Sequence, residues 1–299
     1  MDPREGRVSV CRLDIHYLDW DIPDASGTST DRGAPLILLH GFLDLAWSFA
    51  PFVEAFRKQS ADAGVPTRRL IALDLRGHGD SGWVHGGYYH FPDYVLDVVG
   101  VADGLGIRRF ALLGQSMGSV VASLVAGTVP ERVERLVLVE GLGPPDMSPD
   151  TAPDRFRQWL KDMGRLARQP PRGMASIEEA MERLKGHHPH LTEDLARFLV
   201  EKGTHRREDG RLLWKHDPMH RTRGPQPFYL TQVAAFWRQV ACPVLFVTGT
   251  ESPFHAFNDA ERRKCFAHGR GVDIQGAGHM IHRDAPERMA EEVIRFLVS

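Results

Sequence analysis

The stretch Phe110–Val121 reads FALLGQSMGSVV and places one serine between two glycines. A short apolar run, typical of a buried strand, precedes Gly114, and small or apolar residues, typical of a buried helix, follow Gly118. A serine nucleophile must be held out of a sheet on a sharp strand-to-helix turn, and glycines two residues away on both sides relieve the crowding. The turn also puts Ser116 at a helix N-terminus, where N–H groups favour developing negative charge. We therefore interpret Ser116 as a candidate nucleophile.

A serine hydroxyl is weakly nucleophilic at neutral pH and needs a neighbouring base. The chain has 15 histidines, so context must decide between them. His279 lies in the glycine-rich stretch GAGHM, just before the last expected helix, from where a side chain can reach the Ser116 turn. We predict that His279 is the base, and His282 is its nearest competitor.

The elements around these residues alternate between strands and helices. Alternating residues predict an antiparallel pair at Arg7–Leu13 and Ile15–Trp20. Short buried strands are expected at Pro35–His40, Arg69–Asp74, Arg109–Leu113, Arg135–Val139, Pro243–Thr248 and Gly271–Gln275, and helices at 45–58, 91–104, 116–127, after Asn258 and at 286–298. Buried strands separated by helices predict an α/β fold with a mostly parallel sheet flanked by helices.

The pattern changes between the fourth and the fifth of these buried strands. From about Gly141 to Val240, proline- and glycine-rich joints separate amphipathic helices. We predict a core domain formed by residues 1–141 and 241–299, with residues 142–240 inserted as a helical cap, or lid, over the carboxyl ends of the strands. Its aromatic residues should mainly form the core of the cap and together supply part of a pocket wall: Phe156, Trp159, Phe198, Trp214, Phe228, Tyr229, Phe236 and Trp237.

Composition excludes several classes of protein. The chain has 299 residues and a formal charge of −2, so no basic patch for nucleic acid or an anionic membrane is expected. No apolar run approaches the length of a membrane helix, the charged start is not typical of a signal peptide, and the three cysteines indicate reduced thiols in the cytoplasm. The sequences GDSG (Gly79–Gly82) and HHPH (His187–His190) are interpreted as a tight turn and a solvated loop, and no metal site is predicted.

Short motifs in a characteristic order resemble those of the α/β-hydrolase superfamily: HGF (His40–Phe42), DLRGHGDS (Asp74–Ser81), GQSMG (Gly114–Gly118) and GAGHM (Gly276–Met280). The resemblance covers nearly the whole chain and is greatest for the esterase-like and serine hydrolase-like branch. It implies an α/β-hydrolase fold with a cap after strand six, a nucleophile elbow at Ser116 and no metal or organic cofactor. It also implies an oxyanion hole formed by the backbone N–H groups of Phe42 and Met117.

The acid that would complete a catalytic triad departs from the commonest family pattern. That pattern places an aspartate three residues after the glycine ending strand seven, where this chain has Ser252. Two glutamates could replace it: Glu251, which is one residue early, and Glu140, which ends strand six on the active-site side. A carboxylate at the end of a buried strand needs a partner. We therefore favour Glu140 and keep Glu251 as the alternative acid.

These features predict a serine hydrolase that cleaves a carboxylic ester through an acyl-enzyme. A thioester, an amide and a carbon–carbon bond are the alternative scissile bonds. A ligand-sensing receptor with slow turnover and an inactive scaffold are alternatives from other classes. The expected partner is a small, largely apolar acyl substrate; the residues do not determine its identity or the oligomeric state.

Overall fold

The computed structural model describes residues 2–20, 33–169, 171–254 and 260–299. Its central feature is an eight-stranded sheet with the strand order β1-β2-β4-β3-β5-β6-β9-β10. β2 is antiparallel to both β1 and β4, and every other neighbouring pair is parallel. The strands are β1 (Arg4–Val10), β2 (Leu13–Trp20), β3 (Leu36–Leu39), β4 (Leu70–Leu73), β5 (Phe110–Gln115), β6 (Val133–Val139), β9 (Val244–Gly249) and β10 (Gly269–Ile274). The predicted mostly parallel α/β fold is therefore confirmed.

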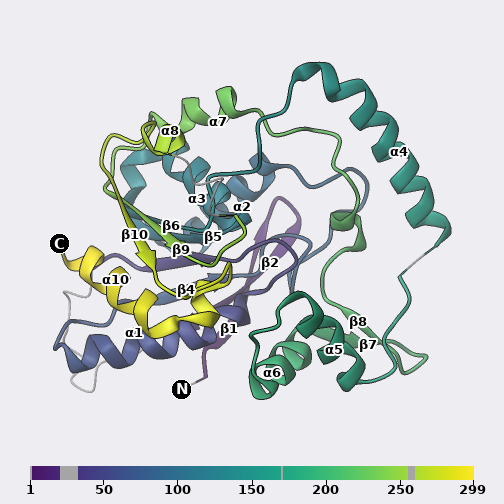
Figure 1. Cartoon of the computed structure of the whole chain (residues 1–299), viewed down its shortest axis with the longest axis horizontal. Coiled ribbons are helices and arrows are strands. Elements are labelled where there is room, and N and C mark those ends of the chain that lie inside the picture. The colour runs from purple at the N-terminus through teal and green to yellow at the C-terminus, as the bar shows by residue number, and fades with distance from the viewer. Residues whose placement is uncertain (1, 21–32, 170, 255–259) are drawn as a thin grey trace.

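Helices cover both faces of this sheet (Figure 1). α1 (Ala50–Asp62) and α10 (Pro286–Val298) pack together on one face, and α2 (Phe91–Gly104) and α3 (Met117–Thr128) lie on the other. The short helices of the core are η1 (Ala46–Phe49), η2 (Pro130–Arg132), α8 (Ala260–Arg263) and α9 (Ile281–Asp284). The predicted helix after Asn258 falls partly outside the described residues.

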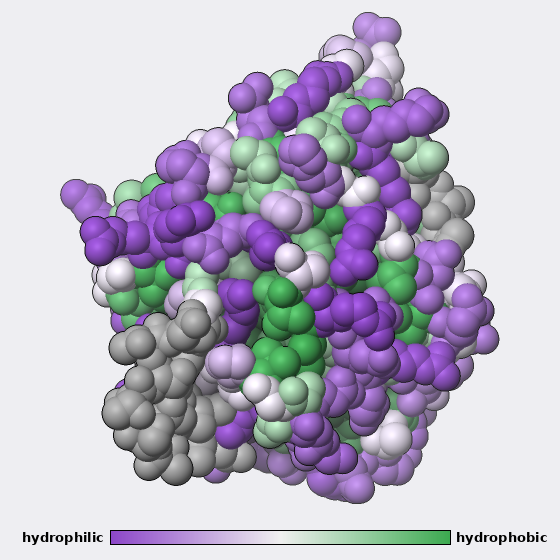
Figure 2. All heavy atoms as spheres, turned by 90° about the vertical axis from the view of Figure 1, so that its left-hand side faces the viewer, coloured by the Kyte–Doolittle hydropathy of each residue, from purple (hydrophilic) through white to green (hydrophobic). Residues whose placement is uncertain are grey.

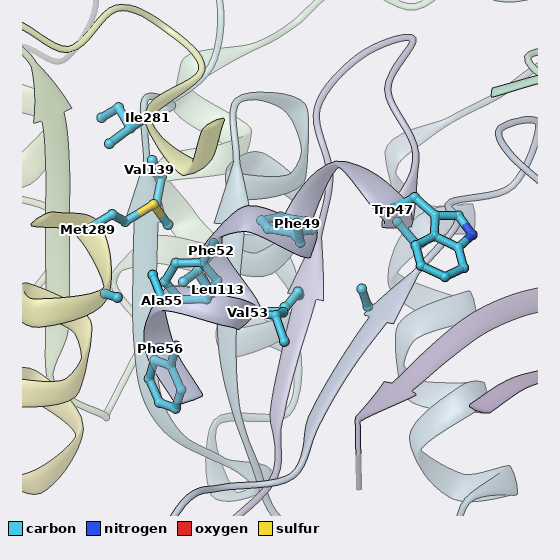
Figure 3. Packing of buried hydrophobic residues seen from close by; sticks show 14 of the residues in the cluster. Trp47, Phe49, Phe52, Val53, Ala55, Phe56, Leu113, Val139, Ile281 and Met289 are labelled. Atoms are coloured by element: carbon cyan, nitrogen blue, oxygen red, sulfur yellow. The ribbon is translucent and has the colours of Figure 1, made fainter. Parts of the chain in front are cut away.

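The alternation of side chains along the strands produces two separate cores. Leu36 and Leu38 of β3 belong to the core beneath α1 and α10, whereas Ile37 and Leu39 belong to the core beneath α2 and α3. Successive residues of a strand point to opposite faces of the sheet. All four side chains are buried because helices cover both faces. Figure 3 shows part of the first core, which includes aromatic side chains of η1 and α1 together with Leu113 and Val139 of the sheet.

The segment between β6 and β9 contains more than the expected helices. Its elements are η3 (Pro149–Thr151), α4 (Ala152–Arg168), α5 (Ile177–His187), α6 (Glu193–Gly203), the hairpin strands β7 (Thr204–Arg206) and β8 (Leu212–Trp214), η4 (Pro218–Arg221) and α7 (Leu230–Trp237). The antiparallel hairpin was not predicted.

The helices of this segment also pack in different places. α7 packs on α3, where Trp237 is fully buried and its indole N–H donates to the Ser123 hydroxyl at 2.9 Å. α5 and α6 bury their apolar faces against the side of the core that contains Trp47. α4 projects to one side of the molecule (Figure 1). The division into core and cap at residues 142 and 240 remains a prediction.

The end of the molecule that carries β10 and α10 has a mainly polar surface. Figure 2 shows that hydrophilic side chains predominate on this face and that hydrophobic residues form small, separate patches. Within the described part of the chain, no helix combines the length and the apolar character needed to cross a membrane.

Candidate active site

Ser116 lies between the end of β5 and the first residue of α3, on a turn that only particular neighbours allow. Its backbone has φ 53° and ψ −115°, a strained conformation for a residue other than glycine. A Cβ on Gly118 would lie 2.1 Å from the Leu39 carbonyl oxygen, and a Cβ on Gly114 would lie 2.2 Å from the Gly118 carbonyl oxygen. Both positions therefore require glycine, because the turn presses α3 against the ends of β3 and β5. This contact explains the two glycines around the serine.

His279 and Glu140 meet at the carboxyl edge of the sheet. His279 Nδ1 is 3.0 Å from Glu140 Oε2. Glu140 follows the last residue of β6 with φ 56°, and its carboxylate is fully buried. The backbone N–H of Gly249 donates to Glu140 Oε1 at 2.6 Å, and the Ser252 hydroxyl donates to Oε2. Three donors therefore satisfy this buried carboxylate.

Glu251, the alternative acid, lies in a different environment. Its side chain is exposed on the turn after β9, and its backbone N–H donates to the Ala277 carbonyl. His282, the alternative base, is completely buried in the core, with its ring 4.9 Å from that of Phe49 and Nε2 3.2 Å from the Ser48 hydroxyl. The structure therefore brings His279 together with Glu140 and places neither alternative at this site.

Two residues of the site have side-chain contacts that the sequence analysis did not identify. Ser252, at the position where the family usually has its acid, donates to Glu140. The side-chain amide of Gln115 donates to the His279 carbonyl at 3.1 Å and so ties the histidine loop to the residue before Ser116. The sequence signal for the contact between Ser252 and Glu140 was a serine at the position where the family usually has its acid. No sequence signal identifies the contact of Gln115.

The two expected oxyanion donors flank the same space. Met117 begins α3, so its N–H has no acceptor within the helix. The N–H of Phe42 donates to no described residue. The next residue, Leu43, has φ 58°, and its N–H donates to His78 Nε2 at 3.3 Å, which holds the loop in place. Burial lowers the pKa of His78, so its ring stays neutral and can accept this bond.

A cavity of about 1080 Å³ contains Ser116, Glu140 and His279 in its wall. Most of the remaining wall is aliphatic or aromatic and comes from α2, α3, α7 and the residues following η4, including Val95, Val120, Leu124, Phe228 and Phe236. The Phe254 ring lies 4.5 Å from the His279 ring at the same site. The predicted apolar pocket beside Ser116 is thus present. No hydrogen bond joins the Ser116 hydroxyl to the His279 ring, although both residues are described.

Part of the predicted cap does not reach this pocket. The cavity wall includes residues of the η4 region and Arg155 of α4, but the described residues of α5, α6 and the β7–β8 hairpin are absent from it. The Phe198 ring of α6 packs instead on Trp47 at 5.7 Å. Among the aromatic residues predicted to line the pocket or the cap core, Phe228, Tyr229 and Phe236 line the cavity.

One group of potential metal ligands occurs among the described residues, consisting of His16, Asp74 and Asp80. His16 Nδ1 is 2.8 Å from Asp74 Oδ2, and Asp74 also accepts the backbone N–H groups of Ala46 and Asp80 at 2.7 and 2.9 Å. Asp80 forms an ion pair with Lys215 at 2.8 Å. These contacts tie β2 to the turn after β4. The Ser81 hydroxyl donates to the Asp74 carbonyl within that turn, as the tight-turn interpretation predicts.

Comparison with known proteins identifies the family. A sequence model of the alpha/beta hydrolase fold matches residues 34–286. The chain belongs to the α/β-hydrolase family. It is 27% identical over 279 residues to the serine hydrolase-like protein of Danio rerio, covering 89% of this chain and 82% of that protein. It is also 27% identical over 291 residues to the sn-1-specific diacylglycerol lipase ABHD11 of Xenopus laevis, covering 94% and 84%.

A solved structure supports the same assignment. The hypothetical protein PA1622 of Pseudomonas aeruginosa PAO1 is 30% identical, covers 99% of this α/β hydrolase and 98% of its own chain, and superposes with a TM-score of 0.81. The predicted family, its serine hydrolase-like branch and the fold are therefore confirmed, and the relatives support hydrolase activity.

Proposed function

We propose that this α/β hydrolase cleaves carboxylic esters with Ser116 as nucleophile, His279 as base and Glu140 as acid. The observation that carries the proposal is the 3.0 Å contact between His279 Nδ1 and the buried Glu140 carboxylate, beside the strained Ser116 turn in one apolar cavity. A carboxylate on Nδ1 directs the neutral ring to present Nε2 as the proton acceptor. The cap formed by residues 142–240 is part of this proposal, since residues around η4 close the pocket.

The reaction follows from these positions. Ser116 Oγ attacks the ester carbonyl carbon while His279 Nε2 takes the hydroxyl proton, and Glu140 stabilises the resulting imidazolium. The N–H groups of Phe42 and Met117 bind the negative oxygen of the tetrahedral intermediate. The intermediate collapses, His279 returns the proton to the departing alcohol, and the acyl group stays on Ser116. Water, deprotonated by His279, then attacks the acyl-enzyme; the second tetrahedral intermediate collapses as His279 returns the proton to Ser116 Oγ, and the carboxylic acid leaves.

The cavity favours an ester with a large apolar acyl group. Aliphatic and aromatic side chains supply most of its wall, so burial of an acyl chain provides binding free energy of roughly 0.8 kcal/mol per methylene. The name of the Xenopus laevis relative describes a lipase acting on diacylglycerol, which is an acyl ester of this kind. An acyl-chain ester is therefore favoured over a thioester, an amide or a carbon–carbon substrate.

Fluorophosphonate labelling and a series of p-nitrophenyl esters of increasing chain length test the proposal. We expect Ser116→Ala to abolish labelling and to lower kcat by at least about a thousandfold, because only binding and oxyanion stabilisation remain. Ser148→Ala, which removes an exposed hydroxyl at the start of η3, is the matched control and should behave as wild type. Normal labelling or turnover by Ser116→Ala would contradict the proposal.

A further inference from the structure

Two arginines lie in the mostly apolar wall of the cavity. Arg155 belongs to the first turns of α4 and is partly buried, whereas Arg223 follows η4 and is exposed. They are 68 positions apart in the chain and both line the cavity. A guanidinium carries its charge at all physiological pH values, so this part of the wall is permanently positive.

Arg155 has no acidic partner among the described residues. Its Nε donates to the Gly224 carbonyl at 2.6 Å, which leaves both terminal amino groups available. Burial and the charge of Arg223 lower the pKa of Arg155, and the other groups that act on it are the hydroxyls of Tyr88 and Tyr229. Burying a charge costs free energy unless a counter-charge or hydrogen bonds compensate it. The charge with the largest effect on the pKa of Arg155 is that of a second cation, Arg223.

The two acids of α4, Asp154 and Asp162, are both engaged elsewhere. Asp162 of α4 accepts from the Arg165 guanidinium at 3.0 Å, from the Gln158 amide at 3.1 Å and from the backbone N–H of Arg223 at 3.3 Å. The last of these contacts holds the backbone at Arg223, and among the described residues no acid forms an ion pair with the guanidinium of Arg223. Arg157, in contrast, forms an ion pair with Asp154 on the outer face of α4. Arg155 therefore differs from Arg157, a surface arginine of the same helix that has an acidic partner.

The wall that carries the two arginines is held by direct packing. The Tyr88 hydroxyl donates to the Thr222 carbonyl at 3.0 Å, and a Cβ on Gly224 would lie 2.7 Å from the Tyr88 ring. The Tyr88 ring also meets the Trp159 ring of α4 edge to face at 6.3 Å. The segment 222–224 and the first turns of α4 thus share Tyr88 as a common support. Such support lowers the cost of ordering the two side chains when a ligand binds.

We propose that Arg155 and Arg223 bind an anionic group of the substrate, a carboxylate or a phosphate. This group lies at a distance from the scissile ester bond. The proposal rests on the proposed function and narrows the substrate class to an ester that combines an apolar chain with a negatively charged end. Arginine donates paired hydrogen bonds to planar carboxylate and to phosphate oxygens, so the two cations suit either group. The charged group could belong to the acyl part or to the alcohol part of the ester.

Binding of octyl phosphate and of octanol to the wild-type protein, measured by calorimetry, tests the subsite without turnover. We expect octyl phosphate to bind at least about tenfold more tightly than octanol. Added salt should weaken the binding of octyl phosphate and leave the binding of octanol unchanged. Arg223→Gln should reduce this ratio by roughly tenfold, because a charge-assisted hydrogen bond is lost. Arg155→Gln should act in the same direction, and since it also removes the bond to Gly224, the exposed Arg223 provides the deciding variant.

Arg157→Gln is the matched control, because it removes a positive charge from the same helix outside the cavity. It should leave the ratio of the two dissociation constants unchanged. Equal affinity of the wild type for octyl phosphate and octanol would overturn the proposal. An equal fall in the preference for octyl phosphate in Arg157→Gln and Arg223→Gln would do the same.

Turnover then locates the charged group within the substrate. Three esters are compared: p-nitrophenyl octanoate, the mono-p-nitrophenyl ester of octanedioic acid, and the octanoyl ester of 4-hydroxyphenyl phosphate. We expect one of the two anionic esters to have a kcat/KM at least about tenfold above that of the neutral ester, and this preference to be lost in Arg223→Gln. Hydrolysis of all three at equal efficiency refutes the subsite while the proposed function stands. Hydrolysis of none refutes the proposed function, and the binding ratio still decides the subsite.

Discussion

Replacing Glu140 by glutamine is the most informative perturbation of the candidate site. The carboxylate accepts from the Gly249 N–H, the Ser252 hydroxyl and His279 Nδ1. A glutamine at this position has one carbonyl oxygen and one amino group. If its oxygen keeps the 2.6 Å bond to Gly249, its amino group faces Ser252 and His279. His279 Nδ1 must then accept a hydrogen bond, and the ring proton moves to Nε2.

The wrong tautomer prevents His279 from removing the Ser116 proton. Loss of the orienting carboxylate in a serine triad lowers kcat on the order of 10⁴-fold, which corresponds to about 5 kcal/mol in the activation free energy. The volume of the side chain is unchanged, so we expect the fold to persist. The unfolding midpoint of Glu140→Gln should therefore stay within several degrees of wild type while ester hydrolysis and fluorophosphonate labelling become slow.

Glu251→Gln is the matched control, because it makes the same chemical change on an exposed side chain nearby. Its kcat should stay within about tenfold of wild type. A folded Glu140→Gln with a kcat within tenfold of wild type would refute the reasoning, as would a large loss in Glu251→Gln alone. The double variant Glu140→Ala/Ser252→Asp should recover part of the lost activity, because it returns a carboxylate to the position that most of the family uses.

Other predictions follow from single contacts. Ser252→Ala removes one donor to the Glu140 carboxylate and should lower kcat by roughly tenfold at an unchanged KM, as steady-state kinetics would show; no change would mean that this hydroxyl does not orient the acid. Gly118→Ala places a Cβ 2.1 Å from the Leu39 carbonyl, so we expect loss of soluble, active protein, and normal expression and turnover would argue against the tight contact. Burial lowers the pKa of His220 to about 3, so the folded state binds fewer protons than the unfolded state between that value and about 6.5. Its contribution to stability is therefore present at neutral pH and is lost as the pH falls, and urea unfolding should show wild type losing about 2 kcal/mol more than His220→Gln between pH 6.5 and 5.

The order of strands and helices could be predicted because each buried strand and each amphipathic helix has its own local pattern. The predicted helix at 91–104 coincides with α2, and the strand at Pro243–Thr248 differs from β9 by one residue at each end. The β7–β8 hairpin was missed because strands of three residues are too short to show alternation. The assignment of α7 to the cap did not anticipate that it packs on α3, since an apolar helix face does not reveal its partner.

The site could be predicted only where its residues are close in sequence or stand in a recognisable motif. Ser116 and His279 each have glycines around them that indicate a special turn. The sequence favoured Glu140 over Glu251 because Glu140 ends a buried strand, but both glutamates stayed open because the direction in which each turn points its carboxylate depends on the fold. The presence of Arg155 and Arg223 in one cavity wall was not predicted. It depends on Tyr88, on which segments from separate parts of the inserted region pack.

Because Glu140 follows β6, the turn after β9 does not have to supply both the proposed acid and part of the cavity wall. Ser116 and Glu140 follow adjacent parallel strands, and the Ser116 N–H donates to the Val139 carbonyl at 2.8 Å. The spacing between the proposed nucleophile and the proposed acid is therefore built into the main chain of the central sheet. In the described part of the turn after β9, Ser252 donates to the Glu140 carboxylate, while Phe254 lines the cavity. Natural variation or laboratory randomisation at Phe254 can thus reshape substrate selection without displacing the acid.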